Sequence, residues 1–184
     1  MITDLMHAFQ CEFELEIIDR LPPAGVPAVY YSPGGTTLGG KDGCLIQVTS
    51  RNGSRWIGMF AGEGDVVVGS CPDPNQFCVV AGGTAVFVNA QNPEEWSAAD
   101  VDQVQEFLPL PDNKMILLVG LTVIQAVGPS GPLWTSGRLS YDGITITQIG
   151  EAYVEGEVWD PTAVTQPRFQ VNLTDGKHTG GAFR

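Results

Sequence analysis

The chain has 184 residues, enough for one domain to bury a sizeable core without disulfides or a metal. Its 9 basic and 21 acidic residues give a net charge of −12, and only 16% of its residues are charged. This composition excludes a disordered chain and a coiled coil, and so acidic a surface would repel DNA, RNA and anionic lipid.

Nothing in the sequence indicates a membrane segment or an export signal. No stretch approaches the roughly 20 consecutive apolar residues that a membrane helix needs. The first residues lack the basic and apolar regions of a secretory signal peptide. We therefore expect a cytoplasmic protein whose partner is another protein or a second copy of itself, as in a homodimer, and neither nucleic acid nor a membrane.

Strand patterns begin at Cys11–Ile17, where Cys11, Phe13, Leu15 and Ile17 alternate with three glutamates. Period-2 alternation predicts a half-buried strand, and the row of carboxylates is typical of a protected sheet edge. Further strands are expected at Ala28–Tyr31, Cys44–Thr49, Arg55–Phe60, Val66–Gly69, Phe77–Ala81, Thr84–Asn89, Val101–Leu108, Met115–Gly120, Thr122–Val127, Ile144–Ile149, Tyr153–Trp159 and Phe169–Leu173.

Turn signals separate these strands. Gly82-Gly83 predicts a tight hairpin, because glycine adopts positive φ without steric cost. Tight turns are also expected at Asp42-Gly43, Asn52-Gly53, Asp142-Gly143 and Asp175-Gly176. Short helical turns are expected only at Pro93–Trp96 and Ser97–Asp100.

An internal repeat appears when the sequence is shifted by 38 residues, relating residues 71–96 to residues 109–134. Gly82 then falls on Gly120, Thr84 on Thr122 and Trp96 on Trp134. We interpret the two tryptophans as core or sheet-edge anchors.

The period and strand pattern over residues 40–160 resemble β-propeller repeats of the WD-repeat and kelch type, and the chain is also similar to uncharacterised bacterial all-β proteins. The resemblance implies one all-β domain over residues 1–184, built from antiparallel blade-like sheets of about 40 residues each. The alternative is a single β-sandwich or barrel.

The cysteines do not have metal-ligand spacing, and we expect neither a metal nor a cofactor. Cys11, Cys44 and Cys78 are expected as buried thiols on strands, while a Cys71–Cys78 bridge across a hairpin stays open. The segment Gly35–Asp42 follows the phosphate-loop pattern through Lys41, but Asp42 replaces the required hydroxyl and a strand pattern follows. We interpret it as a glycine-rich connecting loop.

The sequence contains the residue types of two catalytic arrangements. Glu151, Glu155 and Glu157, with Asp142 nearby in sequence, would supply paired carboxylates for glycoside hydrolysis. However, Glu155 and Glu157 alternate with valine or glycine, which is typical of a solvated face. A Ser140–His178–Asp175 set has no spacing that selects it.

The best binding candidates are Arg138, Tyr141, Asp142 and His178, because arginine and aromatic side chains dominate binding hot spots. We therefore expect a non-enzymatic module that binds a protein or itself. The alternatives are a hydrolase acting on a glycan or ester through paired carboxylates, and a structural subunit that completes a propeller by oligomerisation.

Overall fold

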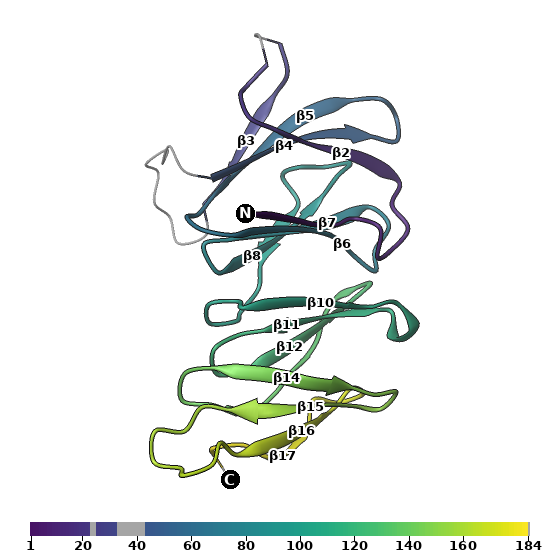
Figure 1. Cartoon of the computed structure of the whole chain (residues 1–184). Helices are drawn as coiled ribbons and strands as arrows, with labels where there is room; N and C mark the ends of the chain where they lie inside the picture. Colours follow the sequence, from purple (N-terminus) through teal and green to yellow (C-terminus); the bar gives the residue numbers. More distant parts are fainter. Residues whose placement is uncertain (23–24, 33–42, 184) are drawn as a thin grey trace. The chain divides into compact units, whose positions relative to one another are not determined.

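The computed structural model describes residues 1–22, 25–32 and 43–183, and within these ranges the protein is all-β, as predicted (Figure 1). One 3-10 turn, η1 (Pro111–Asn113), is the only helical element described. The strands are β1 (Ile2–Leu5), β2 (Phe13–Ile18), β3 (Ala28–Tyr31), β4 (Gly43–Ser50), β5 (Arg55–Ala61), β6 (Val66–Ser70), β7 (Gln76–Ala81), β8 (Thr84–Asn89), β9 (Trp96–Ala98), β10 (Glu106–Leu110), β11 (Met115–Val119), β12 (Ile124–Gly128), β13 (Gly131–Thr135), β14 (Ile144–Ile149), β15 (Tyr153–Val158), β16 (Arg168–Asn172) and β17 (His178–Gly180).

The chain divides into two compact units, Met1–Ala99 and Asp100–Arg184. That residues 1–184 form a single all-β domain stays a prediction. In the first unit, one sheet has the strand order β1-β6-β7-β8-β9 and the other the order β2-β4-β5-β3. β1 runs parallel to β6 and β3 parallel to β5, and the other neighbours are antiparallel. Phe77 of β7 packs against Phe13 of β2 and Phe60 of β5, with ring centroids 5.8 and 6.0 Å away, so the core lies between the two sheets.

β2 is an edge strand, as its row of glutamates predicted. Phe13 is buried and Leu15 packs on the core, whereas Ile17 at the end of the row is 36% exposed. On the opposite face, Gln47 of β4 donates a hydrogen bond to Glu16 at 3.3 Å. The alternation therefore places apolar side chains inward and carboxylates outward, except at the end of the strand.

The second unit consists of two antiparallel four-stranded meanders, β10-β11-β12-β13 and β14-β15-β16-β17. Leu117 and Ile124 of the first meander share one buried cluster with Val154, Phe169 and Val171 of the second. Each sheet therefore buries the inward face of its alternating strands against the other sheet of the same unit.

The segments 71–96 and 109–134, related by the 38-residue shift in sequence, both form antiparallel strands that differ in register. That they are an internal repeat stays a prediction. Trp96 lies opposite Val88, and 38 residues later Trp134 lies opposite Ala126, each on an edge strand. The ring centroids of Trp96 and Tyr31 are 5.7 Å apart, and Trp134 Nε1 donates a hydrogen bond of 2.9 Å to Leu173 O. Both tryptophans therefore anchor an edge strand to the other sheet of their own unit. The hairpins differ, because Ala81 pairs with Thr84 across two residues whereas Val119 pairs with Ile124 across four.

The described strands form four open sheets around two separate cores, so the alternative of a single sandwich or barrel is wrong. A propeller arrangement of blades stays a prediction. The helical turns expected at Pro93–Asp100 are also wrong: β9 forms within this segment and pairs with β8, because tertiary strand pairing outweighs a weak capping signal. The segment Gly35–Asp42 lies outside the described residues. Among those described, no helix has the length and apolar character to span a membrane.

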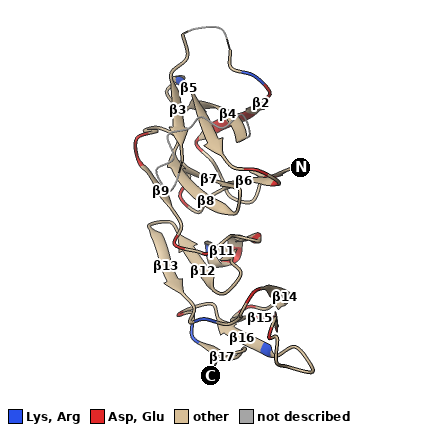
Figure 2. Ribbon diagram, turned by 90° about the vertical axis from the view of Figure 1, so that its left-hand side faces the viewer, with Lys and Arg blue, Asp and Glu red and all other residues tan. Residues whose placement is uncertain are grey.

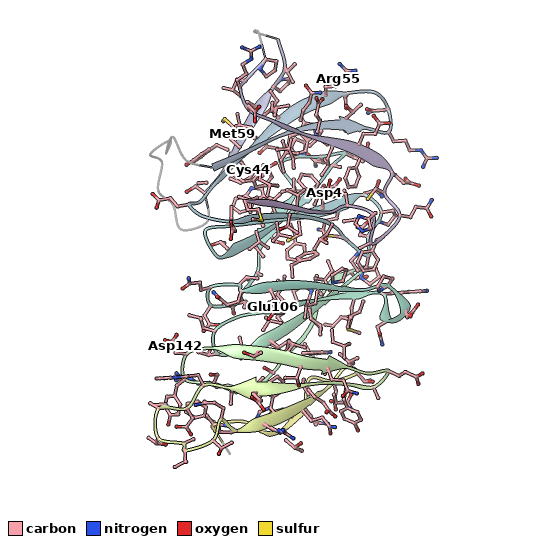
Figure 3. The ribbon with its side chains drawn as sticks, viewed as in Figure 1. Asp4, Cys44, Arg55, Met59, Glu106 and Asp142 are labelled. Carbon is pink, nitrogen blue, oxygen red and sulfur yellow. The ribbon has the colours of Figure 1, made fainter. Side chains whose placement is uncertain are left out.

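All four cysteines are free thiols, so Cys71 and Cys78 are not bridged. Cys44 on β4 and Cys78 on β7 are buried strand residues as predicted, and Cys44 lies between the sheets of the first unit (Figure 3). Cys11 lies just before β2 and is only half-buried. Burial raises the pKa of all four thiols.

The thiols should therefore be unreactive in the native protein. A raised pKa lowers the thiolate fraction at pH 8, and burial blocks access of a reagent to the sulfur. Titration with Ellman's reagent should detect at most Cys11 in the native state and all four cysteines in denaturant without reductant. Rapid reaction of two or more thiols in the native protein would contradict this prediction. So would the reaction of fewer than four thiols in denaturant.

Gly156 fixes the packing of β15 on β16. A Cβ there would overlap Thr145 O and lie 2.7 Å from Cε1 of the buried Phe169 ring. We expect Gly156→Ala to lower the free energy of unfolding by about 1–3 kcal/mol, the usual cost of overpacking a core. A Cβ at Gly150, the control, comes no closer than 3.5 Å to Tyr153 O, so Gly150→Ala should change stability by about 0.5 kcal/mol or less. Equal urea-unfolding midpoints for the two variants would refute this assignment.

Candidate binding surface

The loop between β13 and β14 is held rigidly by two residues. Leu139 is fully buried in the core of the second unit, and its carbonyl accepts a hydrogen bond from Ala182 N–H at 2.8 Å. Ser140 is also fully buried, and its hydroxyl lies 2.6 Å from Gly143 O and 3.1 Å from Trp159 O. The loop is thereby tied both to the segment after β15 and to the segment after β17.

These anchors bring together the exposed side chains of Arg138 and Tyr141 and the half-buried Phe183, which we call the Arg138 cluster. The two aromatic ring centroids are 4.5 Å apart. Arg138 Cζ lies 4.7 Å from the Phe183 ring centroid and 5.7 Å from that of Tyr141, within the range of cation–π attraction. Arg138 Nε donates to Ser140 O at 3.1 Å, and within the described ranges the guanidinium forms no ion pair.

The structure thus brings two of the four predicted binding residues, Arg138 and Tyr141, into one cluster. Asp142 follows on the same loop, with its exposed side chain directed away from the ribbon before β14 (Figure 3). His178 on β17 lies opposite the core residue Val171, and a Cβ at Gly137 would come within 2.7 Å of His178 Cε1. His178 therefore packs against the backbone of the loop rather than on its exposed side.

Sequence reasoning missed Phe183. This residue lies 42 positions after Tyr141 in the sequence and joins it only because the chain after β17 folds back onto Leu139. A lone aromatic residue after two glycines carries no local signal for such a contact.

A nucleophilic triad does not form from Ser140, His178 and Asp175. The Ser140 hydroxyl is buried and directed at backbone carbonyls. Asp175 instead pairs with Lys177 at 2.8 Å, a contact that lowers the pKa of the Asp175 carboxyl. His178 faces Gly137. The three side chains are therefore engaged separately.

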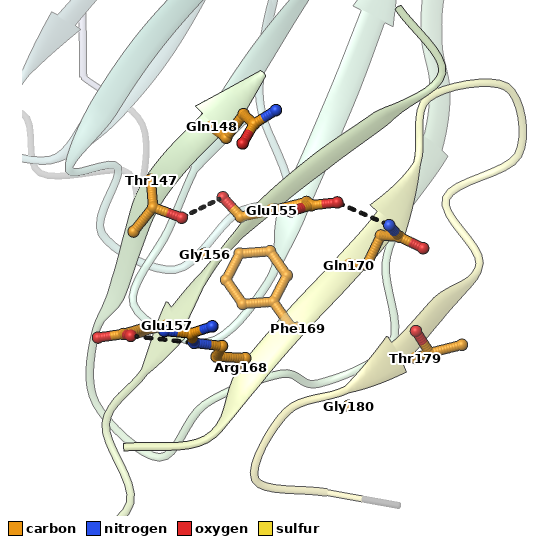
Figure 4. Close-up of a pocket in the computed structure, with 10 residues that line it drawn as sticks. All are labelled: Thr147, Gln148, Glu155, Gly156, Glu157, Arg168, Phe169, Gln170, Thr179 and Gly180. Carbon is orange, nitrogen blue, oxygen red and sulfur yellow. Dashed lines mark hydrogen bonds and ion pairs between the residues drawn. The ribbon is translucent and has the colours of Figure 1, made fainter. Parts of the chain in front are cut away.

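A second candidate is the groove on the face of the β14–β17 sheet that is turned away from the core (Figure 4). Its volume is about 530 Å³, within the range of small-molecule sites. Gln170 Nε2 donates to Glu155 Oε1 at 2.7 Å, and Arg168 Nε lies 3.5 Å from Glu157 Oε1. Thr147, at a bulge in β14, donates its hydroxyl to Glu155 O at 3.3 Å.

The two groove carboxylates are poorly arranged for glycoside hydrolysis. Glu155 and Glu157 are two residues apart on one strand, so they project side by side and do not face each other across a bond. Each already contacts a polar neighbour, and neither is buried in an apolar pocket. Glu151 lies in the exposed turn before β15 and Asp142 in the loop before β14. The geometry favours a binding face over a hydrolytic centre.

No protein-family model matches the chain, and no curated protein matches it either. The fold and the two surfaces therefore define the protein only as an acidic all-β protein with a rigid exposed cluster and a polar groove.

We expect no glycosidase activity that depends on the groove carboxylates. Wild type and the Glu155→Gln/Glu157→Gln double variant should release p-nitrophenol from a panel of p-nitrophenyl glycosides at the same background rate. Turnover by wild type that the double variant loses would restore the hydrolase alternative.

Proposed function

We propose that the protein is a non-enzymatic binding module that docks a protein partner through the Arg138 cluster. The observation that carries this proposal is the pre-assembled guanidinium, which lies against two aromatic rings on a pinned loop and has no ion pair within the described part of the chain. This proposal keeps the three expectations from the sequence: a protein that is not an enzyme, a protein as its partner, and a binding surface that contains Arg138 and Tyr141.

The cluster has the chemistry of an interface anchor. Arginine and tyrosine are enriched among residues that dominate binding energy. Tyr141 is 41% exposed, so its ring is free to lose solvent contact on docking. Because Ser140 and Leu139 already hold the loop, little conformational entropy is lost when a partner binds.

The cluster also indicates the chemistry of the partner. Only Nε of Arg138 has a hydrogen bond among the described residues, so its two Nη groups are available to a bidentate carboxylate. A partner with a local carboxylate and a basic or neutral surface elsewhere fits this site. A second copy of the chain fits less well, because two molecules of net charge −12 repel each other.

Selection from a displayed random-peptide library would test the proposal. Peptides enriched on wild type should carry Asp, Glu or a free C-terminal carboxylate, and should bind Arg138→Ala at least about tenfold more weakly, as expected for a hot-spot residue. The matched control is Arg55→Ala, which removes an exposed arginine from the first unit and should leave binding unchanged.

Two results would count against the assignment: no enrichment on wild type, or enriched peptides that bind Arg138→Ala as tightly as wild type. Sedimentation at rising protein concentration separates the remaining alternative. A wild-type dimer that Arg138→Ala dissociates would identify the partner as a second copy.

A further inference from the structure

We infer that the groove on the β14–β17 sheet binds a neutral oligosaccharide. This site is separate from the Arg138 cluster and does not depend on the function proposed for it. The inference rests on which side chains the strand register places in the groove, on their charges and on their exposure.

The register arranges the groove side chains in cross-strand rows. Glu155 lies opposite Gln170, and Glu157 lies opposite Arg168 (Figure 4). Tyr153 on β15 lies opposite Asn172 in the next row and projects from the same face, because side chains two apart on a strand share a face. Rows are ~7 Å apart along the strands, and neighbouring strands are ~4.8 Å apart. Polar groups therefore line the groove in two rows and continue in the row of Tyr153 and Asn172 beside it, which gives room for more than one sugar unit.

The chemistry of these rows matches a ligand rich in hydroxyl groups. A hydroxyl both donates and accepts hydrogen bonds, and the rows offer carboxylate acceptors, a guanidinium donor and an amide that does both. The Gln170 amide keeps its carbonyl oxygen and one N–H beyond the bond that it gives to Glu155. Tyr153 is 41% exposed, so its ring can cover the apolar C–H face of a sugar.

The floor of the groove is rigid. The bulge between Ile146 and Gln148 re-aims Thr147 toward β15, as bulges next to binding sites commonly do. Beneath the rows, the Phe169 ring fills the space where a side chain on Gly156 would lie. The polar groups are thus held in place before a ligand arrives, which reduces the entropy lost on binding.

Other ligand classes fit the groove less well. Glu155 and Glu157 outnumber the one guanidinium of Arg168, and the chain has a net charge of −12, which disfavours nucleic acids and anionic ligands. A peptide cannot add as a strand, because β15 and β16 are interior strands paired on both sides. Phe169 is only 3% exposed, so the groove offers no apolar pocket for peptide side chains.

Affinity electrophoresis of the full chain in native gels tests the inference. The gels contain dextran, laminarin, xylan or mannan as neutral probes and polygalacturonate as an anionic probe. We expect at least one neutral polysaccharide, and not polygalacturonate, to retard wild type. Tyr153→Ala and Gln170→Ala should each weaken that retardation by about tenfold or more, since each removes a direct contact.

The matched control is Gln47→Ala. Like Gln170, Gln47 donates a hydrogen bond to a glutamate of the neighbouring strand on an outward face. Because Gln47 lies in the first unit and the groove in the second, its loss should leave the retardation unchanged. Retardation by none of the neutral probes would overturn the inference. A preference for polygalacturonate would also overturn it, and so would retardation of Tyr153→Ala and Gln170→Ala as strong as that of wild type. If one of these two variants fails to fold, Thr179→Ala takes its place in the comparison. Binding of selected peptides to the Arg138 cluster would be unaffected by any of these outcomes.

Discussion

Period-2 alternation in the strands is the constraint on which both surfaces of the second unit depend. In β15, Val154 and Val158 are buried, whereas Glu155 and Glu157 on the opposite face line the groove. A slip of one residue would turn the carboxylates into the core and the valines outward. The close contact of Gly156 with the Phe169 ring disfavours such a slip, because a Cβ at this position would lie 2.7 Å from Phe169 Cε1. Core packing thereby fixes the register, and the register fixes which groups face solvent.

The same core positions the loop surface. Leu139 enters the buried cluster, and its neighbours Arg138 and Ser140 are oriented by that insertion. The Ser140 hydroxyl then holds the following turn, and the Leu139 carbonyl holds the segment that carries Phe183. A buried leucine and a buried hydroxyl thus order an exposed arginine and two rings without any contact to a ligand. Pre-organisation of this kind comes from the stability of the unit as a whole.

The sequence was informative where the physics is local. Gly82 and Gly83 have φ of 56° and 77°, which a two-residue hairpin requires, and Gly53, Gly143 and Gly176 also have positive φ at predicted turns. The parallel pairing of β1 with β6 joins residues about 64 positions apart and has no local pattern. β9 was missed because its three residues are stabilised by β8 rather than by their own propensity. Arg138 and Tyr141 could be predicted to lie together because they are three residues apart in the sequence. The contact of Phe183 with them depends on the tertiary fold and has no local sequence pattern.

Two arginines of the second unit differ in their electrostatic surroundings: Arg168 pairs with a carboxylate, and Arg138 does not within the described residues. Acidic residues are spread over both units and basic residues are few (Figure 2), so the surroundings of Arg138 and Arg168 weigh heavily on the charge of their surfaces. Arg168 is paired with Glu157, which leaves the groove without excess positive charge and suits an uncharged ligand. Arg138 lies against aromatic rings instead of a carboxylate, so its charge is polarised but not neutralised. A carboxylate ligand would therefore be attracted by the Arg138 guanidinium at the loop and repelled by Glu155 and Glu157 in the groove, so the two proposed sites are expected to select different ligand classes.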